Sequence, residues 1–145
     1  MKKKNTLLLF LCLFSLWAVA QEKKPVKIAC VGNSITYGSG IKNQFQNSYP
    51  GLLSQLLGEG YDVRNFGISA RVLLNKGDHP YMHEQKFRDL LAFQPDIVTI
   101  KLGTNDSKPW NWRYGKDFKK DLTEMLDILQ ELPSKPKIYL CLPVP

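Results

Sequence analysis

The sequence predicts an α/β domain in which helices cover both faces of a parallel sheet. Four short apolar segments alternate with helical segments along the chain, and connections of this length join parallel strands through crossovers. The chain has 145 residues, of which 43% are hydrophobic and 23% are charged, and this is the size and composition of one globular domain.

The first half of the domain is expected to hold two strands and one helix. Residues 27–31 are apolar except for Lys27 and precede a glycine, which is typical of a buried strand. A helix is expected from Ser48, with a serine cap and Pro50 in its first turn, to Gly58. Residues 61–66 form the second expected strand. The polar residues Asp62 and Arg64 alternate with apolar ones, which indicates a strand at the edge of the sheet. The expected apolar face of the helix consists of four leucines, Leu52, Leu53, Leu56 and Leu57.

The second half is expected to hold two helices, each followed by a strand. Residues 80–93 form a weaker helix that begins at a proline. Residues 97–102, which are mostly apolar, form the third strand. Residues 114–132 form the longest expected helix, which two prolines terminate, and residues 137–142 form the fourth strand. Five residues of the longest helix recur with a period of 3.6 and form its buried stripe: Phe118, Leu122, Met125, Leu126 and Leu129.

The first twenty residues are typical of an export signal. Lys2, Lys3 and Lys4 precede an apolar run from Leu7 to Trp17, and Ala18-Val19-Ala20 is a small-x-small cleavage site before Gln21. The apolar run is well short of the ~20 residues that a membrane-spanning helix needs. We therefore expect residues 1–20 to be cleaved, and residues 21–145 to be exported to the periplasm or the medium without a stable membrane anchor.

Charge and cysteine content exclude two other classes of protein. The formal net charge is +7, but three of the lysines lie in the expected signal and the other basic residues are spread along the chain and form no basic stripe, so we expect no nucleic-acid partner. Three cysteines are too few for a disulfide scaffold. Cys30 and Cys141 fall on the first and fourth strands, too far apart to bridge, and are expected to be buried free thiols.

Polar turns follow the first three expected strands. With the strand order 2-1-3-4, residues 32–38, 65–69 and 103–106 converge on one crevice at the carboxyl ends of the strands. Ser34 could act there as a nucleophile, and the Gly67 N–H and the Asn105 amide could donate to the oxyanion formed when a serine attacks an ester. Because Gly67 has no side chain, a substrate could approach its amide closely.

These turns resemble sequence blocks of a known family. Gly32-Asn33-Ser34-Ile35-Thr36, then Gly67, then Gly103-Thr104-Asn105-Asp106 resemble the first three blocks of the SGNH (GDSL-type) esterase superfamily, in order and with suitable spacing. The resemblance implies a three-layer, flavodoxin-like fold and a serine ester hydrolase without a cofactor or metal. It implies Ser34 as nucleophile, with the Ser34 and Gly67 N–H groups and the Asn105 side chain as oxyanion hole. Asn33 stands where the family has Asp, and Ala70 where glycine is frequent.

The family's catalytic base has no counterpart in this sequence. The family places the base in an Asp-x-x-His block near the end of its domain, and neither His79 nor His83 has an acid three residues before it. The resemblance therefore implies the N-terminal two-thirds of a domain, truncated before its last strand and helix, with the base missing and little activity. The signal and residues 103–112 resemble exported bacterial carbohydrate acetylesterases, such as sialate O-acetylesterase-like proteins. A small ester or an acetylated carbohydrate is the expected substrate.

Other functions stay open at this point. A lipid-directed esterase or lysophospholipase would share the three blocks but would favour long acyl chains. A non-catalytic remnant could bind carbohydrate through Trp110 and Trp112 and would need no catalytic base. A phosphate-binding module could use the loop at residues 32–40, although no lysine or acidic signature supports a nucleotide.

Single residues also have simpler interpretations. Ser34 could be a turn residue or a helix cap. His79 and His83 are expected to be a solvated surface pair, because a metal site would lack a third ligand. Trp110 and Trp112 could stack on sugar rings or form a hydrophobic lid over the core.

Overall fold

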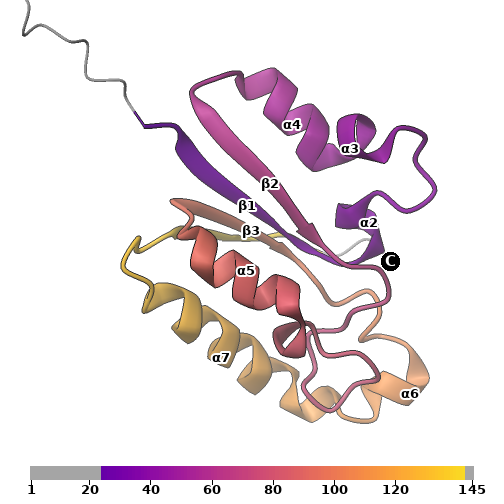
Figure 1. Ribbon diagram of the computed structural model, residues 1–145. Coiled ribbons are helices and arrows are strands. Elements are labelled where there is room, and N and C mark those ends of the chain that lie inside the picture. Colours follow the sequence, from indigo (N-terminus) through magenta and orange to yellow (C-terminus); the bar gives the residue numbers. More distant parts are fainter. Residues whose placement is uncertain (1–23, 143–145) are drawn as a thin grey trace, which may run out of the picture.

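The computed structural model describes residues 24–142, which form a three-layer α/β domain (Figure 1). The expected export signal lies outside the described residues. Among those described, no helix is both long enough and apolar enough to cross a membrane.

The sheet has four parallel strands in the order β2-β1-β3-β4, which confirms the expected topology. The strands are β1 (Val26–Gly32), β2 (Tyr61–Gly67), β3 (Ile97–Lys101) and β4 (Lys137–Leu140). Each lies within one or two residues of its expected position. Strand β2 is at one edge of the sheet, as its polar alternates indicate.

Three helices of two to four turns match the expected ones, with later starts for two of them. They are α4 (Tyr49–Leu57), α5 (Gln85–Phe93) and α7 (Phe118–Gln130). The helix expected from residue 80 begins only at Gln85, because the 3₁₀ turn η2 (Tyr81–His83) is followed by Glu84 in an extended conformation. The helix expected from residue 114 begins at Phe118, after the 3₁₀ turn η3 (Gly115–Asp117).

Three short helices in the loops have no counterpart among the expected elements. They are α2 (Ser34–Tyr37), α3 (Gln44–Asn47) and α6 (Pro109–Trp112). Four residues give too little periodicity for a pattern to be recognised. Two of the three, α2 and α6, lie in loops at the carboxyl ends of strands.

The main core lies between the sheet and helices α5 and α7. Val31 and Val98 from the sheet pack with Leu90 of α5, and with Met125 and Leu129 of α7. The other three members of the expected α7 stripe are partly buried against this core, so that the stripe is confirmed: Phe118, Leu122 and Leu126.

The opposite face of the sheet carries α2, α3 and α4 (Figure 1), and the expected leucine face of α4 is only partly buried. Pro50 is the one fully buried residue of this helix, whereas Leu52 is 46% exposed and Leu56 83% exposed. Helix α4 packs mainly on the edge strand β2, so one flank of the helix faces solvent. Ser48 stands at the cap position, but its hydroxyl makes no capping hydrogen bond.

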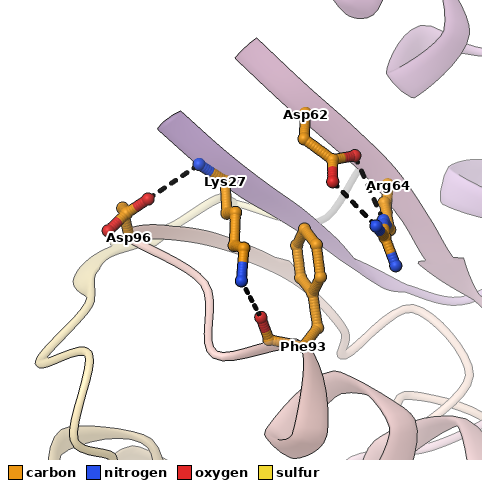
Figure 2. Close-up of polar contacts among 5 residues, drawn as sticks. All are labelled: Lys27, Asp62, Arg64, Phe93 and Asp96. Carbon is orange, nitrogen blue, oxygen red and sulfur yellow. Dashed lines mark hydrogen bonds and ion pairs between the residues drawn. The ribbon is translucent and has the colours of Figure 1, made fainter. Parts of the chain in front are cut away.

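A cluster at the amino-terminal end of the sheet fixes the end of α5 (Figure 2). The Phe93 ring lies 4.2 Å from the Arg64 guanidinium carbon and 5.3 Å from the Lys27 ammonium. Lys27 also donates to the Phe93 carbonyl at 3.1 Å, and its backbone N–H donates to the Asp96 carboxylate at 2.8 Å. Arg64 pairs with Asp62 at 2.8 Å on the exposed edge. These contacts tie α5 and the start of β3 to β1.

Candidate active site

The carboxyl ends of three strands lie side by side, and this brings the three polar turns together. Gly32 of β1 pairs with Gly67 of β2 on one side and with Lys101 of β3 on the other. The Ile68 N–H donates to the Gly32 carbonyl at 3.0 Å and holds the turn after β2 against the turn after β1. The expected convergence of the loops is therefore confirmed.

Ser34 is the first residue of α2, and its neighbour caps that helix. The Asn33 side chain accepts the Ile35 N–H at 3.0 Å, and Gly38 ends the helix with a left-handed φ of 90°. Asparagine and aspartate cap helices equally well, which explains why Asn33 can stand where the family has Asp. Since Asn33 is the cap, the partly buried Ser34 hydroxyl is not needed for that purpose.

The Asn65 side chain ties α2 to the end of β2. Its Nδ2 donates to the carbonyls of Thr36 at 2.9 Å and Tyr37 at 3.2 Å, and its Oδ1 accepts the Gly67 N–H at 2.9 Å. The side chain spans the two loops and fixes the helix that begins with Ser34. The sequence placed Asn65 in the turn at residues 65–69 but indicated no role for its side chain.

The geometry of Gly67 differs from the expected one. Its N–H already donates to the Asn65 side chain, so this amide is not free to bind an oxyanion. A Cβ at Gly67 would collide with the Tyr37 backbone nitrogen and would lie 2.8 Å from the Thr36 carbonyl carbon. The missing side chain makes room for α2 rather than for a substrate. The oxyanion role expected for the Gly67 N–H is therefore corrected.

The turn after β2 contains a residue in an unusual backbone conformation. Ala70 has a φ of 67°, in the left-handed region that favours glycine. This explains why glycine is frequent at this position in the family that the sequence resembles. Among the described residues, no group accepts the Ala70 N–H.

Asn105 and Asp106 join the turn after β3 to the turn after β2. The buried Asn105 side chain donates to the Arg71 carbonyl at 3.0 Å, and its amide nitrogen has a second hydrogen to donate. The fully buried Asp106 accepts the N–H groups of Leu73 and Leu74 through Oδ1, both at 2.8 Å. Burial raises the pKa of the Asp106 carboxyl, and the backbone hydrogen bonds oppose this shift only in part. The sequence indicated no role for Asp106, although this residue belongs to the third block.

The two tryptophans lie on α6 and are half-exposed, at 54% for Trp110 and 53% for Trp112. The Trp110 indole N–H donates to the Asp78 carboxylate at 3.2 Å. The buried Asn111 donates to Asp78 and to the Asn105 carbonyl, both at 3.0 Å. Helix α6 is thus connected to Asn105 by a hydrogen bond. A hydrophobic lid over the core would bury the two tryptophan rings, and both are half-exposed.

His79 and His83 are exposed, and neither imidazole makes a hydrogen bond to another described residue. His79 lies in the loop before η2, and His83 ends that turn. Within residues 24–142 there is no group of three or more His, Cys, Asp or Glu that could hold a metal ion.

The two cysteines of residues 24–142, Cys30 and Cys141, are free thiols, as expected, but only Cys30 is buried. Cys30 lies in β1, and burial raises the pKa of its thiol. Cys141 follows β4 and is exposed. The expected burial of Cys141 is wrong because β4 is the other edge of the described sheet.

Comparisons with known proteins agree with this arrangement. The sequence profile of the GDSL-like Lipase/Acylhydrolase family matches residues 30–145. An acetylxylan esterase of Xylanibacter ruminicola is 48% identical to this chain, in an alignment that covers 87% of this chain and 30% of that protein. The chain thus spans less than a third of the length of this curated relative.

Solved structures with the same fold are more distant in sequence. The inhibitor-bound aryl esterase of M. smegmatis has a TM-score of 0.64 at 23% identity, over 83% of this chain and 65% of its own. Est24, a carbohydrate acetylesterase from Sinorhizobium meliloti, has a TM-score of 0.60 at 21% identity, over 79% of this chain and 62% of its own. At sequence identities this low, the structural similarity establishes the shared fold alone.

Proposed function

The chain belongs to the GDSL-like lipase/acylhydrolase family, and from that premise we propose that it is part of a serine ester hydrolase that removes acetyl groups from carbohydrates. The observation that carries the proposal is the position of Ser34. It begins a short helix at the carboxyl end of β1, next to the ends of β2 and β3. Its hydroxyl is not required as a cap, and polar groups from both neighbouring turns surround this end of the sheet.

In the proposed reaction, the Ser34 oxygen attacks the carbonyl carbon of the acetyl ester and gives its proton to an imidazole base. The carbonyl oxygen becomes an oxyanion, the sugar hydroxyl leaves with the proton, and water then hydrolyses the acetyl-serine. A base must act on the serine, because its hydroxyl is a weak nucleophile at neutral pH.

The oxyanion is proposed to bind three donors from the three turns. The Ser34 N–H comes from the first residue of α2, and the second hydrogen of the Asn105 amide comes from the turn after β3. The N–H of Ala70 replaces that of Gly67 in this proposal, because Gly67 is already bonded to Asn65. The next carbonyl after Ala70, that of Arg71, accepts the Asn105 amide, which supports placing both donors at one point.

Acetylated carbohydrate is the proposed substrate for two reasons. The relative that is 48% identical carries the name acetylxylan esterase. The half-exposed rings of Trp110 and Trp112 lie on α6, which hydrogen bonds connect to Asn105. Aromatic rings offer flat apolar faces with polar edges, and this suits a sugar ring with its C–H groups on one side and hydroxyls around its rim.

The test measures acetate release from 4-nitrophenyl acetate and from acetylated xylo-oligosaccharides by the full-length protein. We expect Ser34→Ala to lower kcat by on the order of 10⁶, and Asn105→Ala by about 10²–10³, the usual effect of one oxyanion donor. The 145-residue chain alone is expected to be slow, because His79 and His83 lie exposed in the segment before α5. Near-normal turnover by the Ser34 variant would show that the nucleophile lies elsewhere.

Export is proposed together with this function. The signal expected at residues 1–20 supports an extracytoplasmic location, where polymeric carbohydrate is accessible. Mass spectrometry of the protein from its native host should find Gln21 at the N-terminus. Retention of Lys2–Lys4 in the mature protein would refute export by cleavage.

A further inference from the structure

A cavity of about 940 Å³ lies beside the candidate active site, between the edge strand β2 and the segment that carries α2, α3 and α4. This is at the upper end of the range of about 300–1,000 Å³ for small-molecule sites. Ser34, Gly67 and Asn105 do not line the cavity, so it is not the catalytic crevice itself. Its lining includes Tyr37, Gln44, Phe45, Gln46, Gln55 and Lys86.

The cavity adjoins the crevice through two of these residues. Tyr37 is the last residue of α2, the helix that Ser34 begins. The half-buried Lys86 donates to the carbonyl of Gly67 at 3.4 Å, and its ammonium lies 6.0 Å from the Tyr37 ring. Tyr37 and Lys86 therefore connect the lining of the cavity to α2 and to the end of β2, where the turns converge.

Side-chain amides give the cavity much of its polar character. Gln46 makes no side-chain hydrogen bond to any described residue. Gln44 and Gln55 each use the amide nitrogen, on the carbonyls of Tyr37 and Gln46, and leave the amide oxygen without a described partner. These groups can donate to and accept from hydroxyls.

Two aromatic rings supply the apolar part of the lining. Phe45 is 90% exposed, and nothing in the described fold covers it. The Tyr37 ring is partly exposed at the end nearer the crevice. A flat ligand with polar edges could stack on the exposed Phe45 ring and form hydrogen bonds to the surrounding amides.

The charges of the lining argue against an anionic ligand and against a lipid. Asp62 and Arg64 neutralise one another at 2.8 Å, which leaves Lys86 as the one unpaired charge among the described residues of the lining. A phosphate would require more than one cation. An acyl chain would require a continuous apolar wall, and the amides interrupt it.

We propose that this cavity binds the sugar residues that flank the acetylated unit of the substrate chain, an inference that rests on the proposed function. Phe45 stacks on the face of one sugar ring, the amides of Gln46 and Gln55 bond its hydroxyls, and Lys86 donates to an oxygen nearer the crevice. The cavity thus selects for oligosaccharide chains over small acetyl esters.

The test compares Phe45→Ala and Gln46→Ala with Leu56→Ala as a matched control. Leu56 is also highly exposed, at 83%, but lies on α4 outside the cavity lining. Because all three side chains are exposed, none of the changes should prevent folding. Two readouts are used: KM for acetylated xylo-oligosaccharides against KM for 4-nitrophenyl acetate, and calorimetric titration of the full chain with unacetylated xylo-oligosaccharide.

We expect Phe45→Ala to weaken the binding of oligosaccharide and to raise its KM about three- to tenfold, with a smaller rise for Gln46→Ala. KM for 4-nitrophenyl acetate should stay unchanged in both, and Leu56→Ala should change neither. Equal effects of Phe45→Ala and Leu56→Ala, no binding of xylo-oligosaccharide, or Phe45-dependent binding of a fatty acid in its place would overturn the proposal. If no ester is hydrolysed at all, the proposed function fails, and the titration still decides whether the cavity binds sugars.

Discussion

Replacing Asp106 tests how the turn that carries Asn105 is held. The Asp106 side chain is fully buried, and its Oδ1 accepts the backbone N–H groups of Leu73 and Leu74 at 2.8 Å each. Its Oδ2 has no hydrogen-bond partner among the described residues. The two N–H groups belong to the segment that follows Arg71, the residue whose carbonyl accepts the Asn105 side chain.

The expected loss of stability follows from these two hydrogen bonds. Asp106→Ala leaves two buried donors unsatisfied at about 1–3 kcal/mol each, and removal of a poorly solvated carboxyl offsets part of this cost. We expect a loss of about 3 kcal/mol, or roughly 10 °C in Tm for a chain of this length. Asp106→Asn keeps one acceptor oxygen, and should cost about 1 kcal/mol. Asp89→Ala, at an exposed position on α5, is the control and should stay within about 0.5 kcal/mol.

The same carboxyl predicts a pH dependence with a definite sign. Burial raises the pKa of Asp106 in the folded chain above its ordinary value of 3.8. The folded state therefore holds this proton to higher pH than the unfolded state. The stability that the group contributes is complete below pH 3.8 and is lost as the pH rises through the folded-state pKa.

Urea unfolding of the wild type and of Asp106→Asn between pH 3 and pH 7 measures this effect. The stability advantage of the wild type should be largest at the acid end and should shrink as the pH rises. Parallel curves would show that the carboxyl titrates with an ordinary pKa. A loss below about 1 kcal/mol in Asp106→Ala would show that the two N–H groups do not depend on this side chain.

Gly67→Ala should destabilise the fold by about 1–3 kcal/mol in urea unfolding, because its Cβ would collide with the backbone of α2. Gly60→Ala has open space at the same point and should cost little; equal losses in the two variants would refute the collision. In a chain with Cys12→Ser, Cys141 should react with a thiol reagent in the native state, whereas Cys30 should react only after unfolding. Rapid modification of both thiols in the native protein would contradict the burial of β1.

Local patterns in the sequence were sufficient for the positions of the strands and of the main helices, whereas the strand order 2-1-3-4 was assumed together with the flavodoxin-like fold that the family resemblance implies. The apolar runs at β1 and β3 and the stripe on α7 are short-range signals, and the crossover rule then leaves few possible topologies. The starts of α5 and α7 were less accurate, because a 3₁₀ turn occupies the residues between the expected start of each helix, Pro80 or Tyr114, and its observed start.

The sequence by itself determined the three-layer α/β fold, and it placed Ser34 and Asn105 in turns at the carboxyl ends of two strands. Only the tertiary structure decided which groups are free to act there. Asn65 takes the Gly67 N–H and also binds the carbonyl of Thr36, 29 residues earlier in the chain. The physical reason is that a hydrogen bond between distant segments depends on how the loops pack, whereas periodicity and turn residues report only on neighbours along the chain.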